Sequence, residues 1–308
     1  MRSPLVELPA DVQRRIAAAL AEPVHPHHVC HLASTCSTFH VALAEPLVAV
    51  RGEHEGITAL CSQCGTTLGT LLREKPRALD WNGAGLAELH ASALCSLIGS
   101  GALATVTDLH LWGNQIGDEG MKAFSAALAT GALTQLSNLN LWDNQIGDVG
   151  MQAFSTALAG GALAQCQTLD LESNKIGDVG MQAFSTALGA LAQCVSLNLS
   201  FNKIGDKGME AFSKALATGA LASVTVPFLG SNQIGDAGME AFSGALATGA
   251  LASVTDLRLM GNQIGDEGMK AFLAALATGA LASIRFIDLV RVWVEGESDD
   301  EGDDEDGS

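Results

Sequence analysis

The chain repeats one pattern of hydrophobic and polar residues, in which two alternating leucines precede a run with apolar residues at helical spacing. The pattern reads L-x-L-x-x-N-[QK]-I-G-D-x-G-M-x-A-F-x-x-A-L. It occurs six times with small departures, and its asparagine falls at Asn114, Asn144, Asn174, Asn202, Asn232 and Asn262. Successive copies lie 30 residues apart, except for one step of 28 residues after Asn174. Self-similarity at a fixed period of this size predicts a solenoid of stacked repeats.

Each copy is predicted to form a short strand followed by a helix. In the first full copy, Leu109 and Leu111 alternate with other residues, which is the period of a strand with one buried face. Met121, Phe124 and Leu128 follow at a spacing that places them on one face of a helix. The leucines and this helical face are therefore the expected core of the repeat.

Three polar or unusual positions carry further expectations. Asn114 lies where the chain turns after the strand, so its amide can bond to backbone groups that the bend leaves unpaired, and stacked copies would form a ladder. Asp118 is placed as the N-cap of the helix that follows it. Pro227 replaces the first strand leucine of its copy. Because an interior proline removes a donor from a sheet, we expect a local distortion there.

Stacking is required because one strand and one helix cannot bury their own apolar faces. The strands must then run parallel, which predicts an α/β solenoid with the sheet on the concave side and the helices on the convex side. The pattern resembles the leucine-rich repeats of the ribonuclease-inhibitor type, whose strand–helix units form a horseshoe, and the resemblance covers residues 79–294. The degenerate copies at the two ends are expected to act as caps.

The first 50 residues are not a repeat and show short apolar helical faces separated by prolines, which predicts a small all-α segment. They resemble the F-box, a module that docks onto the Skp adaptor of cullin-type ubiquitin ligases. The family usually has Val-Cys-x-x-Trp where this chain has Thr35 to Phe39. The alternative interpretation is a helical cap over the first repeat. The residues that the resemblance implies for adaptor binding are Leu8, Pro9, Ile16, Leu20, Val29, Cys36 and Phe39.

Residues 51–78 are expected to form a connector between this segment and the repeats. They contain Cys61-x-x-Cys64, half of a zinc site, but no second ligand pair follows at regular spacing, so we expect no metal. Seven cysteines in a chain of 308 residues do not form a disulfide framework. The chain shows neither an apolar signal core nor a run near the ~18 apolar residues of a membrane span, which favours a cytoplasmic or nuclear protein.

The formal net charge of −18 is concentrated at the C-terminus, where nine acids lie within residues 295–308. This segment lacks apolar residues and is predicted to be a disordered acidic tail. It either keeps the protein soluble or attracts a basic partner. An acidic surface argues against binding the phosphate backbone of nucleic acid.

The sequence offers no catalytic constellation, which predicts a protein that is not an enzyme. It contains no G-x-x-x-x-G-K loop and no G-x-S-x-G elbow. The repeated aspartates resemble a carboxylate array, but their fixed place at the start of each helix is better explained by capping. We therefore expect no cofactor and no small-molecule substrate.

The strand residues between the leucines vary from copy to copy and must point away from the core. Trp112 and Trp142 fall on adjacent strands about 4.8 Å apart and should be direct neighbours. Exposed neighbouring tryptophans favour a binding role, although neutral drift on a solvated face would also produce variation. A second patch is expected at Phe228, Arg258 and Met260. The predicted partner-binding residues are His110, Trp112, Asn140, Trp142, Asp170, Glu172, Asn198, Phe228, Arg258 and Met260.

These observations favour a non-enzymatic protein that binds a partner protein, with a basic partner suited by its charge. If the first 50 residues are an F-box, the resemblance implies a substrate receptor of a cullin-type ubiquitin ligase. Two alternatives stay open. The repeats and acidic tail resemble the Ran GTPase-activating protein, a GTPase regulator, and the fold and charge also suit an inhibitor similar to the ribonuclease inhibitor.

Overall fold

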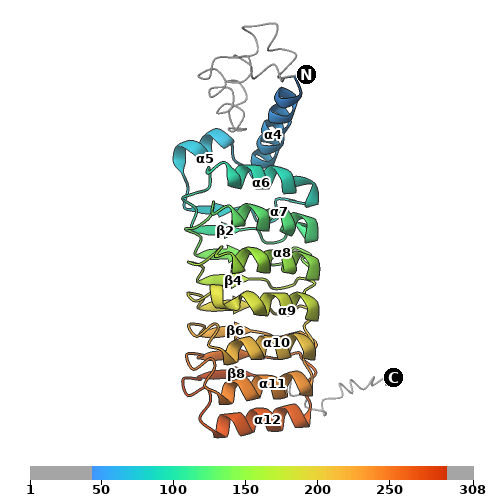
Figure 1. Cartoon of the computed structure of the whole chain (residues 1–308), viewed down its shortest axis with the longest axis vertical. Helices are drawn as coiled ribbons and strands as arrows, with labels where there is room; N and C mark the ends of the chain where they lie inside the picture. Colours follow the sequence, from blue (N-terminus) through green and yellow to red (C-terminus); the bar gives the residue numbers. More distant parts are fainter. Residues whose placement is uncertain (1–43, 290–308) are drawn as a thin grey trace, which may run out of the picture.

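The structure is a computed structural model that describes residues 44–289, with side chains described from residue 54 onward. Strands and helices alternate along the chain and form a tall stack, with strands on one side and helices on the other (Figure 1). The eight strands within residues 44–289 all join one parallel sheet in sequence order. The predicted α/β solenoid is therefore confirmed. The strands are β1 (Ala78–Asp80), β2 (Asp108–His110), β3 (Asn138–Asn140), β4 (Thr168–Asp170), β5 (Ser196–Asn198), β6 (Val226–Phe228), β7 (Asp256–Arg258) and β8 (Phe286–Asp288).

The helices of the repeats pack side by side on the other side of the stack. The helix after β1 has nine residues and is preceded by a 3₁₀ turn, whereas the later ones have ten to thirteen residues. The repeat that is 28 residues long is shortened at the end of α9, where a 3₁₀ turn, η3 (Leu188–Ala190), replaces the last helical turn. The helices are η2 (Glu88–His90), α6 (Ala91–Gly99), α7 (Gly117–Ala129), α8 (Asp148–Ala159), α9 (Asp178–Ala187), α10 (Asp206–Ala217), α11 (Asp236–Ala247) and α12 (Asp266–Ala277).

The core is one continuous layer between the sheet and the helices. The predicted core residues Leu109, Leu111, Met121, Phe124 and Leu128 are all at most 3% exposed, and their counterparts are buried in the same way as far as α11. In the last copy, Met269 and Leu276 are partly buried. Leucine pairs with leucine in register from strand to strand, as with Leu109 and Leu139. Each repeat therefore contributes the same apolar side chains to a shared core, at about 1.5–3 kcal/mol for each fully buried large side chain.

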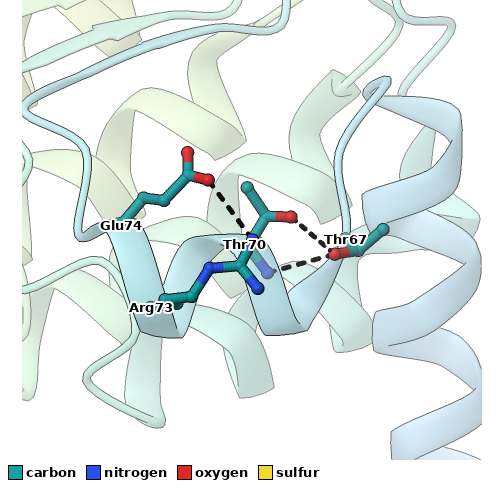
Figure 2. Close-up of polar contacts among 4 residues, drawn as sticks. All are labelled: Thr67, Thr70, Arg73 and Glu74. Carbon is teal, nitrogen blue, oxygen red and sulfur yellow. Dashed lines mark hydrogen bonds and ion pairs between the residues drawn. The ribbon is translucent and has the colours of Figure 1, made fainter.

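Two helices precede the repeats and close the N-terminal end of the core. Helix α4 (Ala44–Gln63) runs across the boundary predicted between the N-terminal segment and the connector, and α5 (Leu68–Glu74) follows it. Ile57, Leu60 and Leu71 are at most 1% exposed and belong to the same apolar cluster as the first repeat. Figure 2 shows the start of α5, where the Thr67 hydroxyl accepts a hydrogen bond of 3.0 Å from the backbone N–H of Thr70.

The repeated asparagines form the predicted ladder. The side-chain amide of Asn174 donates to the backbone carbonyls of Leu141 and Leu171, both at 3.0 Å. Its Oδ1 accepts from the backbone N–H of Ile146 at 2.9 Å. Since Leu141 and Ile146 belong to the preceding repeat, each buried asparagine ties its own turn to the neighbouring one. The same arrangement recurs at Asn202, where the N–H of Ile176 is the donor to Oδ1.

The repeated aspartates also cap helices, but the prediction that each caps its own helix was wrong. Asp118 lies in the first turn of α7, and its Oδ1 accepts from the backbone N–H groups of Gly147 and Gly150, both at 2.8 Å. Gly147 is the N-cap residue of α8, the helix of the next repeat. The same two-donor cap joins Asp148 to Gly177 and Gly180, Asp178 to Gly205 and Gly208, Asp206 to Gly235 and Gly238, and Asp236 to Gly265 and Gly268.

The cap between repeats requires glycine at the third position of the receiving helix. A Cβ built at Gly150 would lie 2.8 Å from Oδ1 of Asp118, closer than real Cβ atoms approach their neighbours, and 3.1 Å from Cβ of Met121, which is tighter than most real Cβ contacts. The glycine therefore allows the carboxylate of the preceding helix to reach the backbone N–H groups.

The distortion expected at Pro227 is present and confined to one strand pair. Strand β6 pairs with β5 over three residues, but with β7 only through Phe228 and Arg258. Proline has no N–H to donate to the neighbouring strand, which explains the loss. The proline itself is buried like the leucines that it replaces, so the stack continues through it.

Replacing one of these aspartates should therefore destabilise the stack. We expect Asp148→Ala to lower the free energy of unfolding by about 1–2 kcal/mol, because it leaves two N–H groups at the start of α9 without their acceptor. Urea denaturation followed by circular dichroism measures the change. Asp266→Ala is the matched control, since no helix follows α12 within residues 44–289 and its side chain is exposed. Equal losses in the two variants would contradict a cap between repeats.

Candidate interaction surface on the sheet

The strand residues that alternate with the buried leucines line the outer face of the sheet, here called the sheet face. The predicted first column, with one residue from each strand after β1, is half-buried throughout. Because each strand is in register with the next, these residues follow one another along the stack. They are His110, Asn140, Asp170, Asn198, Phe228, Arg258 and Asp288.

The predicted second column is more uneven. Trp112 and Met260 are each 40% exposed, whereas Trp142 and Glu172 are half-buried. Ser200 and Gly230 lie between them and are buried, so the column presents only small residues in the middle of the stack. Val290, the last member of this column, lies outside the described residues.

The two tryptophans are direct neighbours, as their register predicts. Their ring centroids are 4.9 Å apart and the ring planes differ by 25°, which is a stacked arrangement. The backbone beneath them is fixed, because the Trp112 N–H donates to Oδ1 of Asn82 at 2.7 Å and the Trp142 N–H donates to Oδ1 of Asn140 at 2.9 Å. The pair is therefore an aromatic surface that is already formed in the free protein.

A pair of carboxylates, Asp170 and Glu172, lies on β4 and the turn that follows it, next to β3 and the turn that carries Trp142. The Asp170 carboxylate accepts a 3.0 Å hydrogen bond from the Glu172 N–H, and Glu172 accepts a 2.6 Å bond from the side chain of Asn198. Neither carboxylate forms an ion pair with a Lys, Arg or His of the described chain. Burial, and to a smaller extent the nearby charge of Glu172, raise the pKa of Asp170. Ionisation of the Asp170 carboxyl is therefore less favourable in the folded protein than in water.

The second predicted patch differs from expectation, because Arg258 already contacts an aromatic ring and a carboxylate of the same chain. The Arg258 guanidinium lies 4.2 Å from the centroid of the Phe286 ring, and its Nη1 is 3.9 Å from Oδ2 of Asp288. Phe286 was missed among the candidate residues, although strict alternation along β8 places it on the same face as Asp288. It is 44% exposed and belongs to a further column at the start of each strand, which includes Asp108 and Asn138.

Other features of the described chain show no comparable arrangement. Burial raises the pKa of Cys61 to about 11 and, with the charge of Cys61, that of Cys64 to about 12, so both thiols stay protonated at neutral pH. No group of three His, Cys, Asp or Glu side chains suited to a metal occurs within residues 44–289. A cavity of about 650 Å³ between α9 and α10 is lined mostly by Ala, Gly, Ser and Thr. None of the helices in this part of the chain has the length and apolarity to cross a bilayer.

Comparison with known proteins identifies the repeats. The family model described as "Leucine Rich repeat" matches six segments, and these follow the period of the strands and helices. No curated protein matches the chain in sequence. The matched segments are residues 102–125, 134–155, 167–185, 195–213, 229–243 and 250–273.

Solved structures with a similar chain path are distant in sequence. The crystal structure of a plant ice-binding protein is 19% identical with a TM-score of 0.39, over 61% of this chain and 50% of that one. The TLR13–ssRNA13 complex is 15% identical with a TM-score of 0.33, over 74% of this chain and 34% of that one. The aligned regions therefore span half of the first protein's length and about a third of the second's.

The cost of the Asp170 charge predicts a pH-dependent effect of removing it. Since burial raises the pKa of Asp170 in the folded state, the protonated carboxyl favours folding, and this contribution is lost as the pH rises through the folded pKa. Asp170→Asn should therefore raise Tm at neutral pH and leave it unchanged at a pH where the carboxyl of the parent protein is protonated. Scanning calorimetry at the two pH values measures this, with the exposed Asp266→Asn as control. A lower Tm at neutral pH would show that the charge stabilises the fold.

Proposed function

Since the chain is a leucine-rich repeat protein, we propose that it is a non-enzymatic interaction module whose sheet face captures a partner protein. The observation that carries this proposal is the stacked pair of Trp112 and Trp142 on an open sheet. Large aromatic side chains in such positions are the residues that most often dominate binding energy at protein interfaces. The repeats themselves indicate protein binding, and the tryptophans indicate where on the repeats it occurs.

The shape of the sheet face favours a protein over a small molecule. Eight strands at a spacing of about 4.8 Å give a surface more than 30 Å long. Small-molecule sites are concave pockets that enclose most of their ligand, whereas an open sheet of this length matches the footprint of a protein interface. The second column has small residues at Ser200 and Gly230 and large ones at Trp142 and Met260, and a partner can follow this uneven surface.

Charge supports a basic partner. The chain has a formal net charge of −18, and the sheet face presents Asp108, Asp170 and Glu172 near the tryptophans. Complementary charge speeds association and disfavours acidic competitors. The acidic segment 295–308, which lies outside the described residues, would add to this attraction.

A finer proposal is that the protein is a substrate receptor of a cullin-type ubiquitin ligase in the cytoplasm or nucleus. The F-box-like residues, from Leu8 to Phe39, lie outside the described part of the chain, so their contacts stay a prediction. They precede α4, whereas the tryptophans lie on β2 and β3 and the turns that follow. Separate segments for adaptor and substrate are what such a receptor needs.

Two alternative roles use the same surface. The acidic C-terminal segment favours a GTPase regulator resembling the Ran GTPase-activating protein, which a GTP hydrolysis assay with a Ran-type GTPase would reveal. The acidic sheet face favours an inhibitor of a basic enzyme, resembling the ribonuclease inhibitor, which a ribonuclease inhibition assay would reveal.

The role of the tryptophan pair predicts the result of a capture experiment. We expect Trp112→Ala/Trp142→Ala to lose the partner that the parent protein retains in affinity purification with mass spectrometry, since truncating interface anchors reduces affinity by roughly 30-fold or more. The matched control is Val149→Ala/Val179→Ala, which removes two exposed apolar side chains from α8 and α9. Retention of the same partners by the tryptophan variant would contradict the proposed surface.

The ligase proposal predicts a second, independent interaction. The full chain should retain a purified Skp-type adaptor in a pull-down, and Leu8→Ala/Phe39→Ala should abolish this while partner capture by the sheet face persists. If the parent protein with folded repeats does not bind the adaptor, the ligase role is excluded and the interaction module remains.

A further inference from the structure

We propose that the tryptophan and carboxylate part of the sheet face recognises an arginine side chain of the partner, an inference that rests on the proposed function. The guanidinium would lie against the indole of Trp142 and beside the carboxylates of Asp170 and Glu172. The partner would therefore present an arginine at this place on the interface.

Trp142 has neighbours in its column on both adjacent strands. Trp112 covers one side of its ring, since the two rings stack at 4.9 Å across neighbouring strands. The next residue in the same column is Glu172, on the turn after β4, which is in register with β3. In its column, Trp142 therefore has an indole as its neighbour on one strand and Glu172 as its neighbour on the other. A cation beside it would meet the ring and the negative charge together.

The carboxylates beside Trp142 lack a paired cation in the described chain. No Lys, Arg or His side chain of the described chain forms an ion pair with Asp170 or Glu172. Lys175, in the turn that follows, donates instead to Oε1 of Gln145 at 3.1 Å. Burial raises the pKa of Asp170, and its carboxylate forms no ion pair within the described chain, so this surface is electrostatically complementary to an incoming cation.

Elsewhere on the sheet face, the chain already holds a guanidinium against an aromatic ring and a carboxylate. Arg258 lies 4.2 Å from the centroid of the Phe286 ring and 3.9 Å from the Asp288 carboxylate. An aromatic ring and a carboxylate of one strand, β8, thus accommodate an arginine from the neighbouring strand β7 at the strand spacing of this sheet. Around Trp142 the ring and carboxylates are present and the cation is left for the partner to supply.

Arginine suits this site better than lysine. Its planar guanidinium can stack on an indole and still direct N–H groups toward carboxylates at its edge. A lysine ammonium is a compact and strongly hydrated charge, so it cannot use the ring face and both carboxylates in the same way.

The test uses two synthetic peptides of equal length, one of alternating Gly and Arg and one of alternating Gly and Lys, at physiological salt. Binding is followed by NMR through the indole N–H signals, of which the chain has four, assigned with single Trp variants. We expect the Arg peptide to shift the signals of Trp112 and Trp142 but not of buried Trp81.

Two double variants separate recognition from general charge attraction. Asp170→Asn/Glu172→Gln should weaken the Arg peptide by about tenfold, the usual scale for losing bonds to charged groups. Glu55→Gln/Glu240→Gln removes the same charge from exposed positions on α4 and α11 and should change affinity little. Circular dichroism confirms that each variant is folded.

Equal affinity for the Arg and Lys peptides, or equal weakening in the two double variants, would overturn the inference and leave only net charge attraction. The proposed function fails separately, if the natural partner is captured without the tryptophans. A partner that needs the tryptophans but tolerates Asp170→Asn/Glu172→Gln would contradict arginine recognition alone.

Discussion

The register between neighbouring repeats depends on two side chains that bond to the backbone of the adjacent repeat. A buried asparagine joins each turn to the one before it, and an aspartate caps the helix of the repeat after it. Their donors and acceptors are backbone groups that would otherwise be unpaired at strand and helix ends. Slipping the stack by one residue would break both contacts along the whole solenoid, so the apolar core and the hydrogen bonds specify one arrangement.

This fixed register turns a sequence repeat into a surface. Positions that contribute to the core or to the inter-repeat bonds hardly vary between copies, while strand positions on the sheet face differ. Trp112 and Trp142 stack because identical places in consecutive repeats lie on adjacent strands. The two halves of the face then differ in charge balance. Arg258 is engaged with Asp288 in the C-terminal half, whereas Asp170 lacks a cation in the N-terminal half of the described chain. The two ends of the sheet face therefore differ in charge, so a bound partner would have a preferred orientation.

Much of this organisation could be predicted from the sequence, because period and alternation are set by backbone geometry. The order of strands and helices, the buried leucines and the tryptophan neighbours all follow from them. The target of the aspartate cap could not be predicted, since an aspartate at the same place in every copy has the same spacing whether it caps its own helix or the next. The contact of Arg258 with Phe286 depends on rotamers across two strands, which alternation alone does not specify. The short repeat was visible as a deletion, but only the structure shows that α9 absorbs it while β5 keeps its register.

Hydrogen–deuterium exchange of the protein with and without its captured partner shows directly whether the partner binds the sheet face. We expect binding to slow exchange of backbone amides in β2, β3 and β4 and in the turns that carry Trp112, Trp142 and Glu172, while helices α7 to α9 behind them are unaffected. Protection confined to the helical side of the stack, or absent from residues 108–172, would contradict it.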